Sequence, residues 1–317
     1  MRLLVLGGTV FLGRHVAEEA VRRGHEVTLF HRGHHGADVL ADRAEHLLGD
    51  RTGDLNELTG RSWDAAIDTC GFEPGPVGRS SELDLGHLVF VSSINAYPGW
   101  PEEHVAEDSP VWAQELDDYG PLKVACERAA ELAMPGRVAV VRAGLLCGPR
   151  DNIGRLSWWI DRIAEGGDVL APGDPERELQ LIDARDLAAW MVHLAERRQA
   201  GSFNGTAPRG QTTMRAMLET AGAAAGADAR LHWRDDGALL AAGVEPWSDV
   251  PLWLPAPGTW TVGTARAQAA GLRCRPVAET VADTRAWLRS GENVSDYRAE
   301  MRPAGITRQR ESELLGL

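Results

Sequence analysis

Residues 3–16 read LLVLGGTVFLGRHV and join an apolar run, two adjacent glycines and an amphipathic segment. The run Leu3–Leu6 is continuous, which is typical of a strand buried on both faces. Residues 12–21 carry apolar side chains at helical spacing, and Gly24 follows as a helix stop. The pattern predicts a strand, a glycine turn and a helix. The alternative, a secretion signal, is disfavoured because charged residues from Arg14 onward interrupt the apolar run and no cleavage site follows.

The glycine turn predicts a binding site for dinucleotide phosphates. Glycines let a pyrophosphate approach the backbone, and the helix N-terminus beyond them offers N–H groups and a partial positive charge. The usual fingerprint is G-x-G-x-x-G, whereas here two glycines are adjacent and four residues precede the third. An ordinary strand–helix loop is therefore the alternative. The expected cofactor contacts in this turn are Gly7, Gly8, Thr9, Phe11, Leu12 and Gly13.

Composition narrows the class of protein. The 317 residues are 44% hydrophobic and 25% charged, which is typical of a globular protein with one large core and an added lobe, or with two domains. A net charge of −13 disfavours binding to nucleic acid or to an anionic membrane. No apolar run reaches the roughly 18 residues of a membrane span. The four cysteines are far apart, which predicts reduced thiols in the cytoplasm. The pair His34-His35 lacks a metal-ligand spacing, so we expect no metal site.

The first half of the chain alternates strands and helices. Strands are expected over residues 26–31, 46–48, 65–68, 88–92 and 138–141, and a helix over 123–132. This rhythm predicts an α/β fold, a Rossmann-like parallel sheet wound on both sides.

The character of the sequence changes after Gly148-Pro149. We expect residues 1–149 to form a dinucleotide-binding domain, to which residues 177–204 return. Residues 150–317 are expected to form mainly a smaller, interleaved substrate-binding lobe and a C-terminal tail, with about 206–288 in that lobe. Thr307 is a candidate cap for a last short helix, and a loosely held tail is the alternative.

Two further motifs carry a family resemblance. The chain reads FVSSINAY at 90–97 and YGPLK at 119–123. Behind the glycine turn, these motifs resemble the extended and atypical short-chain dehydrogenase/reductases, which include NAD-dependent epimerase/dehydratase-like and isoflavone-reductase-like proteins. The resemblance covers most of the chain. It implies a catalytic triad of Ser93, Tyr119 and Lys123, with Ser93 preferred over Ser92 because Tyr97 lies four residues later; for Ser92 we expect a hydroxyl bonded to backbone.

The chemistry of these residue types fits that triad. Tyr119 and Lys123 are four residues apart and share one helix face. Pro121 between them is tolerated if the helix begins near Asp117 or Asp118. A free phenol has a pKa of about 10, and a nearby ammonium lowers it. Tyr119 is then suited to exchange a proton with a carbonyl or alcohol oxygen, while the Ser93 hydroxyl polarises the same oxygen.

The resemblance implies further cofactor contacts. Asp50 matches the acid that contacts adenine, and Cys70-Gly71 replaces the usual Ala-Gly after the fourth strand. Residues 142–151, RAGLLCGPRD, resemble R-x-x-N-x-Y-G-P, in which Pro149 would lie against the nicotinamide. The Asn that helps to hold a sugar nucleotide is Leu145 here, which weakens that substrate class. Lys123 is also expected to anchor the cofactor ribose.

The end of the second expected strand bears on the choice of cofactor. An NAD enzyme of this architecture carries an acid about 20 residues past the turn. Here the strand ends at His31-Arg32, and a guanidinium grips a 2′-phosphate. We therefore favour NADP(H), with Arg32 as the main contact and Arg14 or His31 assisting; NAD(H) stays open.

The second half holds eight of the eleven tryptophans, densest at Trp158-Trp159 and in EPWSDVPLWLP, residues 245–255. An apolar wall for a cyclic substrate is one interpretation, and ordinary core packing is the other. We predict an NADP(H)-dependent oxidoreductase for a small, partly apolar or cyclic carbonyl compound or alcohol. The alternatives are a sugar epimerase/dehydratase that uses transient oxidation and, less favoured, a non-enzymatic nucleotide-sensing or RNA-associated protein. The expected partner is a small-molecule substrate, and a homodimer is left open.

Overall fold

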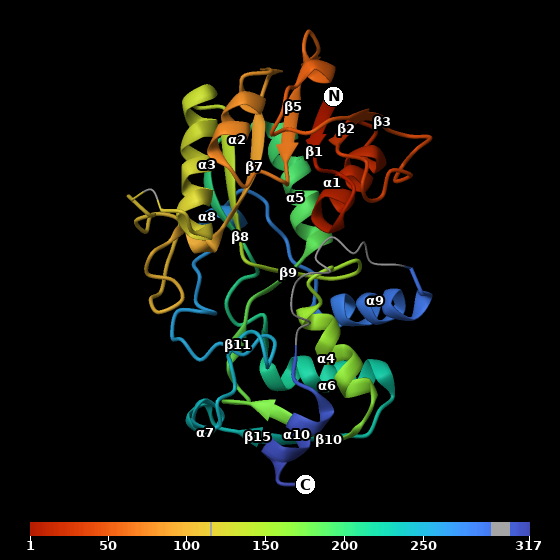
Figure 1. Cartoon of the computed structure of the whole chain (residues 1–317), viewed down its shortest axis with the longest axis vertical. Coiled ribbons are helices and arrows are strands. Elements are labelled where there is room, and N and C mark those ends of the chain that lie inside the picture. Colours follow the sequence, from red (N-terminus) through yellow and green to blue (C-terminus); the bar gives the residue numbers. More distant parts are fainter. Residues whose placement is uncertain (115, 293–304) are drawn as a thin grey trace.

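A seven-stranded parallel sheet forms the centre of the first unit in the computed structural model, which describes residues 1–114, 116–292 and 305–317 (Figure 1). The sheet order is β13-β8-β7-β5-β1-β2-β3. These strands are β13 (Gly201–Gly205), β8 (Val138–Ala143), β7 (Leu88–Ser93), β5 (Ala65–Asp68), β1 (Arg2–Leu6), β2 (Glu26–His31) and β3 (Glu45–Leu48). From β1 the chain first adds β2 and β3 on one side and then β5, β7, β8 and β13 on the other. The carboxyl ends of β1 and β5 therefore border the crevice where ligands bind in such sheets. The predicted Rossmann-like fold is confirmed.

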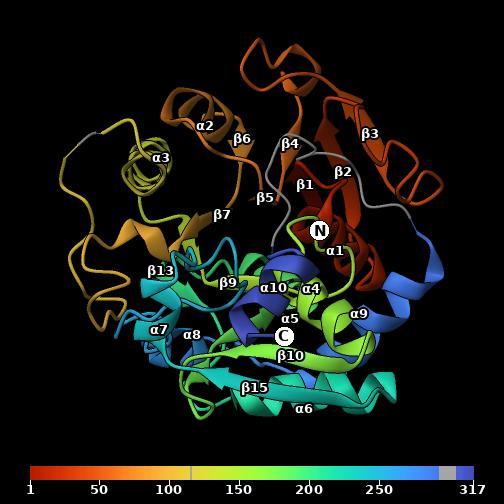
Figure 2. The same cartoon turned by 60° about the horizontal axis from the view of Figure 1, so that its bottom comes forward.

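Helices cover both faces of the sheet, which explains the apolar runs in strands such as β1 and β7. On one face α1 (Phe11–Arg22) packs beside α5 (Ala184–Arg197). On the other face α2 (Pro74–Ser81) packs beside α3 (Tyr119–Ala133), as Figure 2 shows.

The start of α3 follows from local sequence. Asp118 precedes the helix in an extended conformation, and its carboxylate accepts a hydrogen bond from the Tyr119 N–H at 2.7 Å. Pro121 therefore falls in the first turn, where its missing N–H has no partner to lose. Tyr119 and Lys123 stand in the first two turns of one helix.

The second unit has its own hydrophobic core, formed around two fully buried tryptophans, Trp159 and Trp253. The strands β10 (Gly167–Pro172) and β15 (Ala229–Arg234) pair in parallel at the bottom of Figure 1. Helices α4 (Arg155–Ala164), α6 (Met214–Ala225), α7 (Asp236–Ala241), α9 (Val277–Ser290) and α10 (Arg308–Leu315) complete this unit. Thr307 caps α10 by accepting the Arg310 N–H, so the helical alternative for this part of the tail is the one observed.

The remaining elements are short. They are β4 (Ser62–Trp63), β6 (Asp84–Leu85), β9 (Leu145–Cys147), β11 (Glu178–Leu179), β12 (Leu181–Asp183), β14 (Thr212–Thr213), α8 (Ala265–Ala269) and the 3₁₀ turns Asn56–Leu58 and Ile94–Ala96. Although the sequence pattern assigns α8 to the second lobe, it packs against β13, and Ala267 lies in the core of the first unit. None of the helices in the described ranges is long and apolar enough to cross a membrane.

Candidate functional site

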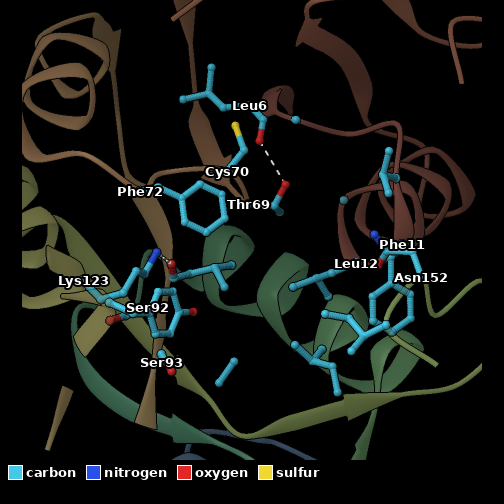
Figure 3. A pocket seen from close by; sticks show the side chains of 18 of the residues that line it. Leu6, Phe11, Leu12, Thr69, Cys70, Phe72, Ser92, Ser93, Lys123 and Asn152 are labelled. Carbon is cyan, nitrogen blue, oxygen red and sulfur yellow. Dashed lines mark hydrogen bonds between the residues drawn. The ribbon is translucent and has the colours of Figure 1, made fainter. Parts of the chain in front are cut away.

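A single cavity of about 820 Å³ runs from the glycine turn, past the carboxyl ends of β2, β5 and β7, to loops of the second unit. In Figure 3, Ser92, Ser93 and Lys123 lie on one side of it, and Phe11, Leu12 and Asn152 lie on the other. The predicted site residues that line it are Gly7, Gly8, Thr9, Phe11, Leu12, Gly13, Arg32, Asp50, Cys70, Ser93, Tyr119 and Lys123. Gly71 and Pro149 are not among the described residues that line it.

The glycine turn is built for a group that touches its backbone. Gly7 and Gly8 have φ angles of +107° and +61°, which side chains rarely adopt. A Cβ on Gly13 would lie 2.7 Å from the Gly8 nitrogen, so the helix packs directly on the turn. The N-cap residue of α1 is Val10, and within the described residues its side chain makes no capping hydrogen bond to the helix. The first N–H groups of α1 stand beside the cavity, and this cradle fits a dinucleotide pyrophosphate.

The far end of the cavity carries the residues expected at the adenosine. Arg32 and Asp50 are exposed and line the cavity. Hydrogen bonds from the Thr52 N–H and hydroxyl lower the pKa of Asp50, which keeps it a carboxylate. Arg14, expected to assist Arg32, instead pairs with Glu18 and Glu292 at 3.0 Å each.

His31 holds the segment after Arg32 through its ring. Its Nδ1 accepts the Gly33 N–H at 3.1 Å, so the neutral ring carries its proton on Nε2. That Nε2 donates to Nδ1 of His46 at 2.9 Å, and His46 donates to the Val39 carbonyl. Burial, aided by His46, lowers the pKa of His31 and favours this neutral state.

Lys123 is buried and held by backbone. Its ammonium donates to the carbonyl oxygens of Gly71 and Val91, the latter at 2.7 Å, and lies 4.5 Å from the Phe90 ring centroid. Burial lowers the pKa of this ammonium. Two of the three N–H bonds are thus committed, and one remains to meet a ligand or the phenol. Gly71, expected to touch the cofactor, acts here through its carbonyl on Lys123.

Ser93 and Tyr119 line the same cavity as Lys123. Ser93 ends β7, is only 7% exposed, and accepts the Asn95 N–H at 3.2 Å. Tyr119 is 45% exposed at the start of α3. The fold therefore brings the three residues of the expected triad to one cavity. Pro149, which was expected to lie against the nicotinamide, is held from its backbone: its carbonyl accepts a hydrogen bond from His15 at 3.0 Å.

A buried polar network lies behind these residues. The Ser92 hydroxyl donates to the carboxylate of Glu127, so the expected bond to backbone is wrong. Glu127 also pairs with Arg142 at 2.7 Å, and Arg142 donates to the Tyr97 oxygen. Tyr97 in turn donates to Asn204 on β13. The network connects α3 to β7 and β8 and thereby fixes the backbone that carries Ser93. No motif in the sequence indicated that Glu127 takes part in it.

Cys70 lines the cavity as a neutral thiol. Burial, aided by the Asp68 carboxylate, raises the pKa of this thiol to about 11. At neutral pH the group is therefore no nucleophile.

The tryptophans divide between core and cavity. Trp159 and Trp253 are fully buried in the second core, which excludes them from a substrate wall. Trp247 lines the cavity, and so do Trp100 and Trp260, which the sequence pattern did not single out.

Comparisons with known proteins identify a matching family model and similar proteins. The model of the NAD dependent epimerase/dehydratase family matches residues 77–205. The chain is 30% identical over 256 residues to human epimerase family protein SDR39U1 and 29% identical over 252 residues to the bovine protein, covering in each case 71% of this chain and 81% of the relative.

Solved structures share the fold. Bordetella bronchiseptica WbmH in complex with NAD⁺ is similar with a TM-score of 0.71 at 17% identity, over 92% of this chain and 99% of that one. The UDP-Glc/GlcNAc 4-epimerase of Campylobacter jejuni is similar with a TM-score of 0.70 at 14% identity, over 91% and 99%.

Proposed function

Because the chain belongs to the NAD-dependent epimerase/dehydratase family, we propose that it is an NADP(H)-dependent oxidoreductase for a small, partly apolar, cyclic carbonyl compound or alcohol. It is an NAD(P)-dependent enzyme of the short-chain dehydrogenase/reductase type and uses a nicotinamide cofactor. The observation that carries the proposal is the one cavity that joins the glycine turn to Ser93, Tyr119 and Lys123.

The residues of the triad take different roles. When bound, the nicotinamide supplies or accepts the hydride. Tyr119 donates a proton to the carbonyl oxygen during reduction and removes it during oxidation. The Ser93 hydroxyl donates a hydrogen bond to the same oxygen, which stabilises the charge that develops there. Lys123 uses its remaining N–H either on the phenol oxygen, where the ammonium lowers the pKa of Tyr119, or on the cofactor ribose, where it anchors the cofactor.

Arg32 supports the preference for NADP(H). Its guanidinium is exposed at the end of β2 and lines the cavity. A 2′-phosphate placed there meets a cation able to form a forked pair of hydrogen bonds. Asp50 stands on the next loop, where it suits an adenine amino group.

A substrate screen tests this function. Cyclic ketones and the matching secondary alcohols are supplied with NADPH or NADP⁺, and absorbance at the reduced nicotinamide band is followed. The Tyr119→Phe protein is the control. Turnover that Tyr119→Phe abolishes supports the proposal, whereas equal turnover in both proteins contradicts the role of the triad.

Epimerisation or dehydration of a sugar by transient oxidation is the second candidate. The family description and the epimerases among the similar structures favour it. Leu145, where sugar-nucleotide enzymes carry Asn, speaks against a nucleotide-linked sugar. The candidates differ in one readout: an epimerase keeps its cofactor bound and converts substrate with no net absorbance change, and an oxidoreductase consumes cofactor in step with product.

We propose the cytoplasm as its location, because the four cysteines are free thiols. The homodimer stays a prediction.

A further inference from the structure

The end of the cavity in the second unit is lined by Arg155, Trp247 and Trp260, and we call it the Arg155 end. The Arg155 guanidinium carbon lies 4.6 Å from the centroid of the Trp247 ring. The Trp247 and Trp260 rings are 6.1 Å apart. Because the expected cofactor contacts come from the first unit, the Arg155 end is where a substrate extends away from the triad.

A second cavity of about 310 Å³ adjoins this end. Among the described residues, Trp260 is the one that lines both cavities. The lining of the second cavity includes residues 255–257, which read PAP, and two arginines, Arg177 and Arg209. Each of these arginines is paired with a carboxylate. The second cavity therefore carries no excess charge and suits an uncharged, apolar group.

The Trp260 indole separates the two cavities. It faces both of them and is only 6% exposed, so it fills the space where they would otherwise join. Its Nε1 has no hydrogen-bond partner within the described residues. Packing alone therefore holds the ring, and a smaller side chain at this position breaks no hydrogen bond of the indole.

The backbone on both sides of Trp260 is held independently of its ring. The Gly258 N–H donates to the Pro101 carbonyl at 2.8 Å. The Val262 N–H donates to the side-chain oxygen of the buried Gln180 at 2.8 Å. Because these bonds persist when the indole is removed, a smaller side chain should leave the loop in place and join the two cavities.

We propose that Trp260 is a specificity-determining residue that limits the length of the substrate. Its indole stops a substituent that points from the reacting carbonyl toward the Arg155 end before that substituent reaches the second cavity. The parent protein then prefers compact cyclic ketones, and loss of the indole admits a longer apolar chain into the second cavity. This inference rests on the proposed oxidoreductase function.

The test compares a short with a long substrate. The probes are 4-methylcyclohexanone and 4-pentylcyclohexanone, each with NADPH, and the readout is the pentyl-to-methyl ratio of kcat/KM. The parent ratio is expected to be about 0.1 or lower, because atoms forced into filled space cost about tenfold or more. In Trp260→Ala the ratio is expected to exceed one, since each methylene that enters the second cavity contributes about fourfold.

Trp287→Ala is the matched control. Trp287 lies in α9, is 8% exposed, and also has an Nε1 without a hydrogen-bond partner within the described residues, but it lines neither cavity. This variant is expected to keep the parental ratio. Titrations of NADPH show which variants are folded. Trp260→Leu, which removes less volume, takes the place of an unfolded Trp260→Ala and is expected to raise the ratio in the same direction.

Binding without turnover separates the two proposals. 4-Methylcyclohexanol and 4-pentylcyclohexanol are titrated against protein saturated with NADPH, which cannot oxidise them. A parental preference for the methyl alcohol that Trp260→Ala reverses, with no ketone reduced, supports the role of Trp260 and contradicts the oxidoreductase. Ketone reduction with equal ratios in the parent and Trp260→Ala, a parent that already favours the pentyl ketone, or an equal change in Trp287→Ala overturns the role of Trp260 alone. Failure of the parent and of the folded Trp260 variant to bind or reduce any of the four compounds contradicts both proposals.

Discussion

Replacing Gly13 with alanine is expected to weaken cofactor binding about ten- to a hundredfold. The added Cβ would lie 2.7 Å from the Gly8 nitrogen and 2.9 Å from the Thr69 hydroxyl oxygen. Thr69 is not free to move, because its hydroxyl donates to the Leu6 carbonyl at 3.0 Å. The start of α1 must therefore shift away from the turn. A charge-assisted hydrogen bond to phosphate is worth about 1.5–3 kcal/mol, and losing one gives the expected fall in affinity.

Stability changes less than affinity. Alanine stabilises a helix by about 0.5–1 kcal/mol relative to glycine, and overpacking costs about 1–3 kcal/mol. The free energy of unfolding should therefore fall by about 0–2.5 kcal/mol.

Gly78 in α2 provides the matched control. A Cβ there would meet only the Ala129 Cβ, at 3.9 Å, which is an ordinary contact. Gly78→Ala should gain about 0.5–1 kcal/mol of stability and keep its cofactor affinity. Calorimetric titration with NADPH and thermal unfolding measure both quantities. A parental Kd in Gly13→Ala, or an equal loss in Gly78→Ala, would refute the reasoning about the cradle.

Tyr119→Phe should lower turnover about 10²–10⁴-fold with nearly parental cofactor affinity, and a steady-state rate within about threefold of the parent would contradict its role as acid. Lys123→Ala should weaken cofactor binding and shift the acid–base limb of the pH–rate profile. A limb at the parental pH would contradict the claim that Lys123 lowers the pKa of the Tyr119 phenol. Arg32→Asp should reverse an NADPH preference of about ten- to a hundredfold, as titrations of both cofactors would show, and an unchanged preference would mean that the end of β2 does not select the cofactor. His87 is 1% exposed, and burial, aided by nearby arginines, lowers its pKa to about 4. Unfolding lets this ring take up a proton more readily, so the protein should lose stability as pH falls from about 6.5 to 4, and His87→Gln should remove about 3 kcal/mol of that loss in denaturant titrations.

The centre of the sheet was predictable because the residues of its strands by themselves show the pattern of a buried strand. Leu3–Leu6 and residues 88–91 are unbroken apolar runs, and such runs are typical of strands that are buried on both faces. The start of α3 was readable for a similar reason, since Pro121 tolerates only the first turn of a helix.

Contacts between distant residues were not readable in this way. The partner of Ser92 is set by which helix the fold lays over β7, and that helix brings Glu127 to it. Tryptophan spacing likewise does not tell a core ring from a cavity ring: Trp253 is fully buried while Trp247, six residues earlier, lines the cavity. The pairing of Arg155 with Trp247 joins residues about 90 positions apart, and only the packing of the second unit reveals it.

A crystal structure of the complex with NADP⁺ tests the central claim most directly. The pyrophosphate is predicted on the N–H groups between Gly7 and Gly13, with the 2′-phosphate at Arg32. The nicotinamide is predicted beside Tyr119 and Lys123, with the Arg155 end of the cavity left open. A cavity that stays empty at saturating NADP⁺ and NAD⁺, or a nicotinamide placed away from Tyr119, would contradict the account.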